Sequence, residues 1–215
     1  MNNLCYKFKR DFFNKFKQMK FGIIIYGSNI FEEISNDLDL CIVGENITEQ
    51  EKREIKEMVI QFHNSNKLKL DDEVPYNNKL FFSYEEIINA IIYNPFIING
   101  KINIRKIQKD KQFLSSIEMR KRLIINILTT KHIMINCDTS KMQIAKNMAW
   151  DLILKVIIEY SSIKTLEPDV ILKNLYYDSK NNVEGEMFLG YKKGNMKKEE
   201  YLLKEIKQAL IRNKL

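Results

Sequence analysis

The sequence predicts an α+β protein in which a small mixed β-sheet with helices is followed by an all-helical region. Short, β-rich apolar runs occur before residue 112 and indicate strands. Ser or Thr followed three residues later by Glu marks several helix starts. From about residue 113 onward, long apolar stretches of helical length follow one another. We therefore predict an N-terminal α/β domain, residues 1–112, and a C-terminal helical domain, residues 113–215.

The N-terminal domain is predicted to begin with a helix and two strands. Residues 5–19 place four phenylalanines near helical spacing among lysines, which predicts an amphipathic helix packed on its own domain. The apolar run FGIIIYGS predicts a strand that ends at Gly27-Ser28. Residues 29–34 are expected to form a short helix or turn, and LDLCIV, residues 38–43, is predicted to be the second strand.

One more helix and a third strand are predicted next. Thr48 and Glu51 form a T-x-x-E capping box, which opens a helix that runs to about His63. The stretch KLKLDDEVPY, residues 67–76, is predicted to be the third strand, and Pro75 stops it.

The remaining segments complete the predicted order. A second capping box at Ser83 predicts a helix through Tyr93, and Asn99-Gly100 between apolar runs predicts a hairpin. A third capping box at Ser115 predicts a helix that runs to about Ile135. Further helices are predicted over residues 140–162, 168–177 and 196–213.

Two aspartates stand at the start of the second predicted strand. Alternate side chains of a strand share a face, so Leu38 and Leu40 point one way while Asp37 and Asp39 point the other. Two carboxylates on one face repel each other, and burial strengthens that repulsion. A divalent cation between them removes it, and carboxylate oxygens are the hard ligands that Mg²⁺ prefers.

The third predicted strand supplies a further acid. Asp71 and Glu73 fall on the face opposite its apolar residues, and either can join the first two aspartates if the strands are neighbours. Three carboxylates can hold two metal ions, which together activate an attacking oxygen and stabilise a leaving group. The choice among Asp71, Asp72 and Glu73 is left open.

The Gly27-Ser28 pair is predicted to bind an anion. A glycine at a strand end allows close approach of the backbone, and the following turn presents free N–H groups. The Ser28 hydroxyl adds a hydrogen-bond donor. A triphosphate bound there would lie beside metals held by the aspartates.

This order of motifs resembles the DNA polymerase β-like nucleotidyltransferase superfamily. The small size and helical tail resemble its minimal and antibiotic-modifying members. The motifs cover about residues 20–75, and the rest resembles the family only by architecture. The resemblance implies that Gly27 and Ser28 hold the nucleotide phosphates, that Asp37 and Asp39 ligate the metals, and that Asp71, or Glu73 in another register, is the third ligand.

Two departures from the family pattern stand out. The spacer between Ser28 and Asp37 is short, and the frequent Ala-Arg-Gly after Gly-Ser is replaced by Asn29-Ile30-Phe31. The phosphate-facing role of that arginine is therefore unassigned. Lys67, Lys69 and Lys79 are the candidates to replace it.

The resemblance implies transfer of a nucleoside monophosphate from an NTP, with ATP expected, to a hydroxyl of a small antibiotic-like acceptor, with release of pyrophosphate. Two Mg²⁺ ions are the implied cofactors. The long helical half favours a small acceptor over a protein side chain, the acceptor of antitoxin-like members. A catalytically inactive nucleotidyltransferase-fold binding module is the other alternative. Asp151 and Glu159 are weak candidates for a general base.

The composition of the chain limits the classes of binding partner and the cellular compartment that we expect. The chain has 215 residues and a net charge of +7, which favours polyanions, yet no nucleic-acid-binding module is recognisable, so a nucleic-acid acceptor is not favoured. Three widely spaced cysteines do not form a disulfide framework. No secretory signal or membrane span is visible, so we expect a cytoplasmic protein without a membrane partner. The oligomeric state is left open.

Overall fold

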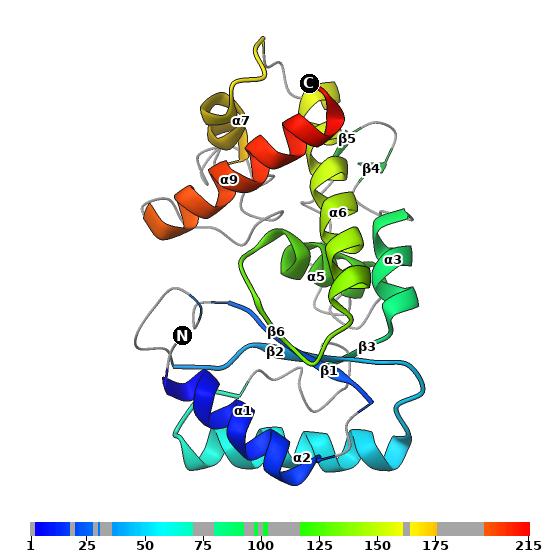
Figure 1. The fold of residues 1–215 in the computed structure, drawn as a ribbon, viewed down its shortest axis with the longest axis vertical. Coiled ribbons are helices and arrows are strands. Elements are labelled where there is room, and N and C mark those ends of the chain that lie inside the picture. The colour runs from blue at the N-terminus through cyan, green and yellow to red at the C-terminus, as the bar shows by residue number, and fades with distance from the viewer. Residues whose placement is uncertain are drawn as a thin grey trace. The chain divides into compact units, whose positions relative to one another are not determined.

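A computed structural model describes residues 3–17, 20–27, 30, 36–70, 80–92, 97–98, 101–102, 117–160, 164–175 and 196–215 (Figure 1). These residues form an α+β fold, with seven helices, a four-stranded mixed sheet and a separate two-stranded hairpin. The broad fold class predicted from the sequence is therefore confirmed.

The chain divides into two compact units. The sheet unit comprises residues 1–86 and 131–142, and the helical unit comprises residues 87–130 and 143–215. The chain thus leaves the sheet unit and returns to it for one short segment. The predicted boundary near residue 112 lies outside the described residues.

The sheet has the strand order β3-β2-β1-β6. Its strands are β1 (Gly22–Ile25), β2 (Leu40–Val43), β3 (Phe81–Phe82) and β6 (Ile133–Ile135). The central strand β1 runs antiparallel to both neighbours, with Ile25 opposite Leu40 on one side and Ile133 on the other. β3 joins the far side of β2 in parallel. The two predicted strands over residues 21–28 and 38–43 are thus present as β1 and β2.

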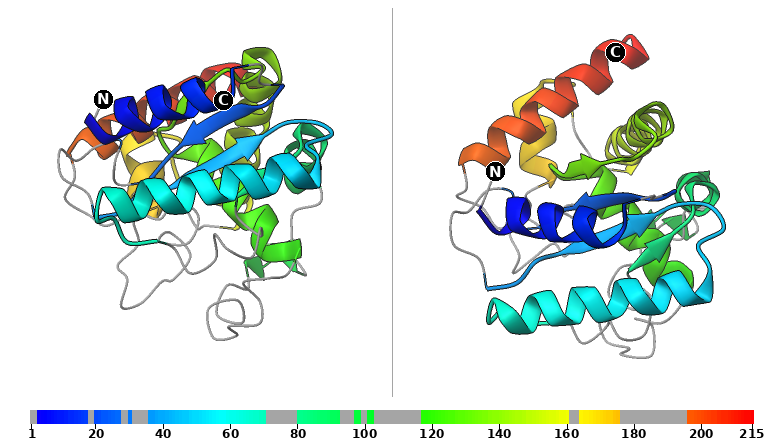
Figure 2. Two further views of the ribbon diagram at one scale, coloured as in Figure 1. Left: turned by 90° about the horizontal axis from the view of Figure 1, so that it is seen from below. Right: turned by 60° about the horizontal axis from the view of Figure 1, so that its bottom comes forward.

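Helices α1 (Asn3–Lys15) and α2 (Glu49–Ser65) cover one face of this sheet (Figures 1 and 2). The core between them is aromatic: the Phe8 ring lies 5.5 Å from that of Phe12 and edge-on to that of Phe62 at 5.0 Å. Edge-to-face ring pairs add to the free energy of burial. The helix predicted over residues 5–19 therefore packs on its own unit, as expected.

The strands contribute alternate residues to this core. The inward-facing residues share one face of the sheet: they are Ile23 and Ile25 of β1, Leu40 and Ile42 of β2, and Ile135 of β6. The intervening Ile24, Cys41 and Val43 are buried as well. The strands β1 and β2 are therefore buried on both faces, which explains the nearly continuous apolar runs over residues 21–25 and 40–43, whereas Met134 of β6 is 36% exposed.

The capping box at the start of α2 is confirmed. The Glu51 N–H donates to Thr48 Oγ1 at 3.2 Å, and the Thr48 N–H donates to the Glu51 carboxylate at 2.8 Å. The two residues satisfy each other's otherwise unpaired groups, which stabilises the helix by about 1 kcal/mol. The Ser83 hydroxyl likewise accepts from the Glu86 N–H at 3.0 Å, at the start of α3 (Tyr84–Ile92).

The prediction that the helix starting near Ser115 reaches Ile135 is wrong for its last residues. Helix α5 (Ile117–Thr129) ends earlier, and Ile133–Ile135 form β6. The hydroxyls of Thr129 and Thr130 donate to carbonyls four residues back, at 2.7 and 2.8 Å, where the apolar helical pattern stops. β-branched isoleucines then gain backbone hydrogen bonds by pairing with β1, which a local sequence pattern cannot reveal.

The third strand predicted over residues 67–76 is not formed where the structure describes it. Residues 67–70 contain no strand, and residues 71–76 lie outside the described ranges. The Lys69 N–H nevertheless donates to the Asn36 carbonyl at 2.6 Å. The strand beside β2 is β3, whose neighbour Leu80 accepts from the Ile42 N–H at 2.6 Å.

The helical unit contains the hairpin and most of the C-terminal helices. The hairpin is confirmed, with β4 (Ile97–Ile98) antiparallel to β5 (Lys101–Ile102). The C-terminal helices are α6 (Thr139–Tyr160), α7 (Pro168–Leu175) and α9 (Met196–Asn213). Helix α7 packs on α9 (Figure 1). No helix within the described ranges is both long and apolar enough to cross a membrane.

Candidate functional site

The sequence-predicted site lies at one end of the sheet, which we call the Gly27 end. Tyr26 and Gly27 follow β1 there, and the stretch from Asp37 to Asp39 leads into β2. Because β1 and β2 are antiparallel, the end of the first strand meets the start of the second. The Tyr26 N–H donates to the Asp39 carbonyl at 3.0 Å, which extends the ladder by one residue beyond the strands.

The two aspartates lie on the face of the sheet that points away from α1 and α2. Leu38 and Leu40 are 3% and 6% exposed and belong to the core beneath the sheet, while Asp37 and Asp39 are half-buried. The predicted alternation of leucines and acids is therefore present. The core anchors the leucines and so directs both acids to the opposite face.

Gly27 lies directly against the Asp39 carboxylate. Its φ angle is +81°, in a region that favours glycine. A Cβ atom at this position would collide with Asp39 Oδ2 and lie 2.9 Å from Asp39 Cγ. Glycine is thus required here both by the backbone conformation and by the close approach of the carboxylate.

The turn after β1 is partly described. The Ile30 N–H donates to the Gly27 carbonyl at 3.3 Å, as in a tight turn. Ser28 and Asn29 lie outside the described residues, so the predicted hydroxyl donor of Ser28 stays a prediction.

The third acid also stays a prediction, because Asp71, Asp72 and Glu73 lie outside the described residues. The hydrogen bond from Lys69 to Asn36 does bring that segment to the residue before Asp37. In the part of the chain that the structure describes, no three His, Cys, Asp or Glu side chains gather as a metal site.

Asp37 and Asp39 fit a hard divalent cation as two of its ligands. Both offer carboxylate oxygens from one face of an extended segment, and neither belongs to the buried core. Two carboxylates leave most coordination positions of Mg²⁺ to water and to phosphate oxygens, which is how this ion is usually bound.

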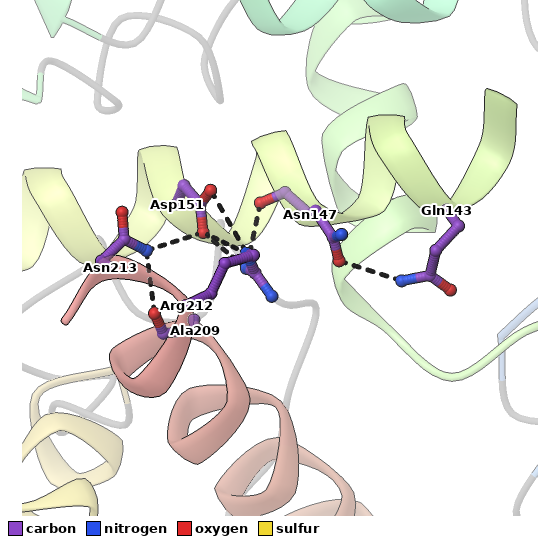
Figure 3. Close-up of polar contacts among 6 residues, drawn as sticks. All are labelled: Gln143, Asn147, Asp151, Ala209, Arg212 and Asn213. Carbon is purple, nitrogen blue, oxygen red and sulfur yellow. Dashed lines mark hydrogen bonds and ion pairs between the residues drawn. The ribbon is translucent and has the colours of Figure 1, made fainter. Parts of the chain in front are cut away.

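Asp151 of α6, a candidate general base from the sequence, forms an ion pair with Arg212 of α9. Arg212 Nε donates to Asp151 Oδ1 at 3.1 Å, and Asn213 Nδ2 donates to the same oxygen at 2.9 Å (Figure 3). Arg212 also donates to the Asn147 carbonyl at 3.3 Å. These contacts join α9 to α6. They give the Asp151 carboxylate a structural role that does not require catalysis. The side chain of Glu159 is outside what the structure describes.

Trp150 and His63 have structural positions. Trp150 is 1% exposed and belongs to the core. His63 is 2% exposed, and its Nδ1 donates to the Val59 carbonyl at 2.8 Å within α2. Neither shows an arrangement suited to catalysis.

Two basic residues that the sequence placed within the helical half also lie at the Gly27 end. Lys131 and His132 immediately precede β6, and β6 pairs antiparallel with β1, so they come to the end of the sheet where Gly27 lies. The prediction of a helix through residue 135 hid this placement. The signal that could have found them is the Thr129-Thr130 pair, which interrupts the apolar helical pattern just before the Ile-Met-Ile run.

Comparisons of the chain with protein-family models, with curated proteins and with solved structures find no match. A functional assignment therefore depends on the residues and geometry of the chain itself.

Proposed function

We propose that this protein is a metal-dependent nucleotidyltransferase that moves a nucleoside monophosphate from an NTP to an acceptor hydroxyl. The observation that supports the proposal is the contact at the Gly27 end. A positive-φ glycine lies against the Asp39 carboxylate, and Asp37 is placed two residues away on the same face. The backbone at the end of β1 therefore lies directly beside two acids.

In the proposed reaction, the acceptor oxygen attacks the α-phosphorus of the nucleotide. A new O–P bond forms, the bond from the α-phosphorus to the bridging oxygen breaks, and pyrophosphate leaves with that oxygen. The acceptor proton passes to solvent or to a base. Mg²⁺, held by Asp37 and Asp39, would supply charge stabilisation of the phosphates.

The chain's own residues have positioning roles in this proposal. Gly27 and Ser28 are proposed to hold the nucleotide phosphates, with the Ser28 hydroxyl donating to a phosphate oxygen. Asp71 is the proposed third carboxylate: it follows Lys69 by two residues, and the Lys69 N–H is bonded to the carbonyl beside Asp37. At most about 7 Å of chain separates Lys69 from Asp71, so the acid can reach the pair.

The proposed acceptor is a small hydroxylated molecule, and the proposed nucleotide is ATP. Amino sugars with several hydroxyls are the first acceptors to test, because their positive charge complements the acidic pair and the bound phosphates.

The proposal is tested with α-labelled ATP, Mg²⁺ and a panel of polyhydroxylated amino sugars. We expect Asp39→Asn and Asp37→Asn to abolish label transfer and Mg²⁺-dependent ATP binding by calorimetry. Asp169→Asn, on the exposed first turn of α7, is the matched control and should behave as the wild type. Undiminished transfer in Asp39→Asn would show that the metal assignment is wrong.

Calorimetry also distinguishes catalysis from a binding module. If the wild type binds ATP equally well with and without Mg²⁺ and transfers no label, the nucleotidyltransferase proposal fails and a non-catalytic nucleotide-binding role remains.

A further inference from the structure

Helix α1 and the residues next to it carry most of the positive charge of the chain. Residues 3–20 contain six Lys or Arg residues and one aspartate, so their net charge is +5 within a chain total of +7. Helix α2 covers the same face of the sheet, but its three Lys or Arg residues and four glutamates give a net charge of −1. The excess of positive charge is therefore a local property of α1.

The basic side chains of α1 face solvent, because its apolar side is used by the core. Phe8 and Phe12 are fully buried and belong to the core of the sheet unit. Lys7 is exposed and donates to the Asn66 side chain. Four further basic side chains are exposed: they are Lys9, Arg10, Lys15 and Lys17.

Nearby acids leave most of these charges unbalanced. Arg10 forms an ion pair with Asp11 at 3.1 Å. Among the residues that the structure describes, no carboxylate lies within ion-pair distance of Lys9, Lys15 or Lys17. Unbalanced cations along one helix attract a polyanion.

An exposed tyrosine lies among these cations. Tyr6 is 57% exposed, and Lys9 and Arg10 follow it by three and four residues, so the three side chains are neighbours on the helix. We call this surface the basic face of α1: it consists of Tyr6, Lys9, Arg10, Lys15 and Lys17. Cations that pair with phosphates beside an aromatic ring that stacks on a base are how proteins bind single-stranded nucleic acid.

Two other polyanionic partners fit this surface less well. A helix that binds a membrane places its apolar side among the lipids, and that side of α1 is already buried in the core. An acidic protein segment would pair with the cations but has no bases to stack on the Tyr6 ring. The combination of charge and aromatic exposure thus favours nucleic acid.

We propose that the basic face of α1 binds single-stranded nucleic acid without sequence preference. The helix has 13 residues, so the surface is about 20 Å long. It lies on the face of the sheet opposite to that of Asp37 and Asp39. The bound strand is therefore a partner separate from the acceptor of nucleotidyl transfer, and the inference does not depend on the proposed function.

The test is fluorescence anisotropy of labelled oligo(dT) and oligo(U), each about twelve nucleotides long, titrated with the full chain in EDTA. Four cations paired with phosphates predict a slope of log K against log salt of about −3. We expect Lys9→Gln/Lys15→Gln/Lys17→Gln to weaken binding about tenfold or more at low salt and to reduce the slope to about −1.

Variants of Tyr6 test the stacking contact. Tyr6→Ala should weaken binding about tenfold at an unchanged salt slope, because the lost ring carries no charge. Tyr6→Phe keeps the ring and should bind like the wild type. Thermal unfolding of each variant verifies that it is folded.

A matched control removes three lysines elsewhere on the chain. Lys197→Gln/Lys204→Gln/Lys207→Gln, at exposed positions of α9, lowers the net charge by the same amount and should bind like the wild type. Asp39→Asn should also bind the oligonucleotides like the wild type, because the Asp39 carboxylate is on the other face of the sheet.

Several results would overturn the inference. Equal losses in the α1 and α9 triple variants would assign binding to the net charge of the whole chain. Unchanged affinity in the α1 triple variant or in Tyr6→Ala, or loss of binding in Asp39→Asn, would place the strand elsewhere. Binding of anionic vesicles or heparin, or of nothing, in place of the oligonucleotides would reject the proposed partner. None of these results decides the nucleotidyltransferase proposal, whose test measures label transfer and Mg²⁺-dependent ATP binding.

Discussion

Gly27 illustrates how one residue couples backbone conformation to the chemistry of the site. Its positive φ and its contact with the Asp39 carboxylate are separate requirements, and glycine alone meets both without strain. The Gly-Ser pair and the two aspartates were predicted from the sequence as one site. Their direct contact could not be predicted, because it depends on the pairing register of β1 and β2.

Substitution of Gly27 tests this coupling. We expect Gly27→Ala to lower the free energy of unfolding by about 1–2 kcal/mol, because alanine is strained at positive φ. It should also reduce Mg²⁺-dependent ATP binding, because its Cβ displaces the Asp39 carboxylate. Chemical denaturation and calorimetry measure the two effects.

Gly27→Asn separates the two causes. Asparagine tolerates positive φ better than alanine but carries a Cβ, so stability should recover in part while binding stays impaired. Recovery of binding together with stability would show that the Cβ does not disturb the carboxylate.

Asp151 is a residue to which the sequence and the structure assign different roles. As an acid on an apolar helix it was a weak candidate for a general base, but it is paired with Arg212 and Asn213 (Figure 3). We expect Asp151→Asn to retain nucleotidyl transfer within about twofold and to lose at most about 1 kcal/mol of stability, as for a partly exposed ion pair. Loss of transfer at unchanged stability would return Asp151 to the list of catalytic residues.

At the scale of elements, helices with local start signals were predictable, and so were the apolar strands β1 and β2, but the short strands β3 and β6 were not. The capping box at Thr48 and the hairpin at Asn99-Gly100 were predicted because their signals lie within a few residues. β6 and β3 are three and two residues long, and each gains its hydrogen bonds from a strand far away in sequence. No local pattern carries that information.

A buried ion pair joins α6 to α9. Lys146 Nζ lies 2.6 Å from a carboxylate oxygen of Glu205, and their side chains are 19% and 8% exposed. The Lys146 ammonium also lies 5.4 Å from the centre of the Tyr201 ring. Burial and the nearby Glu205 carboxylate raise the pKa of the Tyr201 phenol.

We expect Lys146→Met to lower the free energy of unfolding by about 3–5 kcal/mol, because it leaves the Glu205 carboxylate buried without its partner. The double variant Lys146→Met/Glu205→Leu should recover most of that loss, since no charge is left unpaired. Lys204→Met, at an exposed position on α9, is the control. Equal losses in the single and double variants, measured by denaturant unfolding, would contradict this explanation.

At the scale of the whole molecule, buried thiol and phenol groups make the free energy of unfolding depend on pH. Burial raises the pKa of the Cys137 thiol from the ordinary value of 9.0 to about 11, and desolvation raises the pKa of the Tyr84 phenol. As pH rises past 9, the unfolded chain loses the thiol proton while the folded chain retains it. Unfolding then releases a proton, so this stabilising contribution is present below about pH 9 and is lost between about pH 9 and 11.

The prediction is a fall in the thermal unfolding midpoint above about pH 9, measured by circular dichroism. In Cys137→Ala the fall over this interval should be shallower than in the wild type. Identical pH profiles for the two proteins would mean that Cys137 does not hold its proton in the folded state.

β6 sets the order in which the chain can complete its fold. The Asn136 side chain donates to the Phe21 carbonyl across 115 residues of sequence, beside the pairing of β6 with β1. Closing so long a loop slows folding, because its entropy is lost before the contacts are gained. During synthesis, β1 waits as a sheet edge with unpaired backbone groups until residue 135 emerges. Such an edge can pair with another chain, so we expect nascent or truncated forms that lack β6 to depend on chaperones or to aggregate.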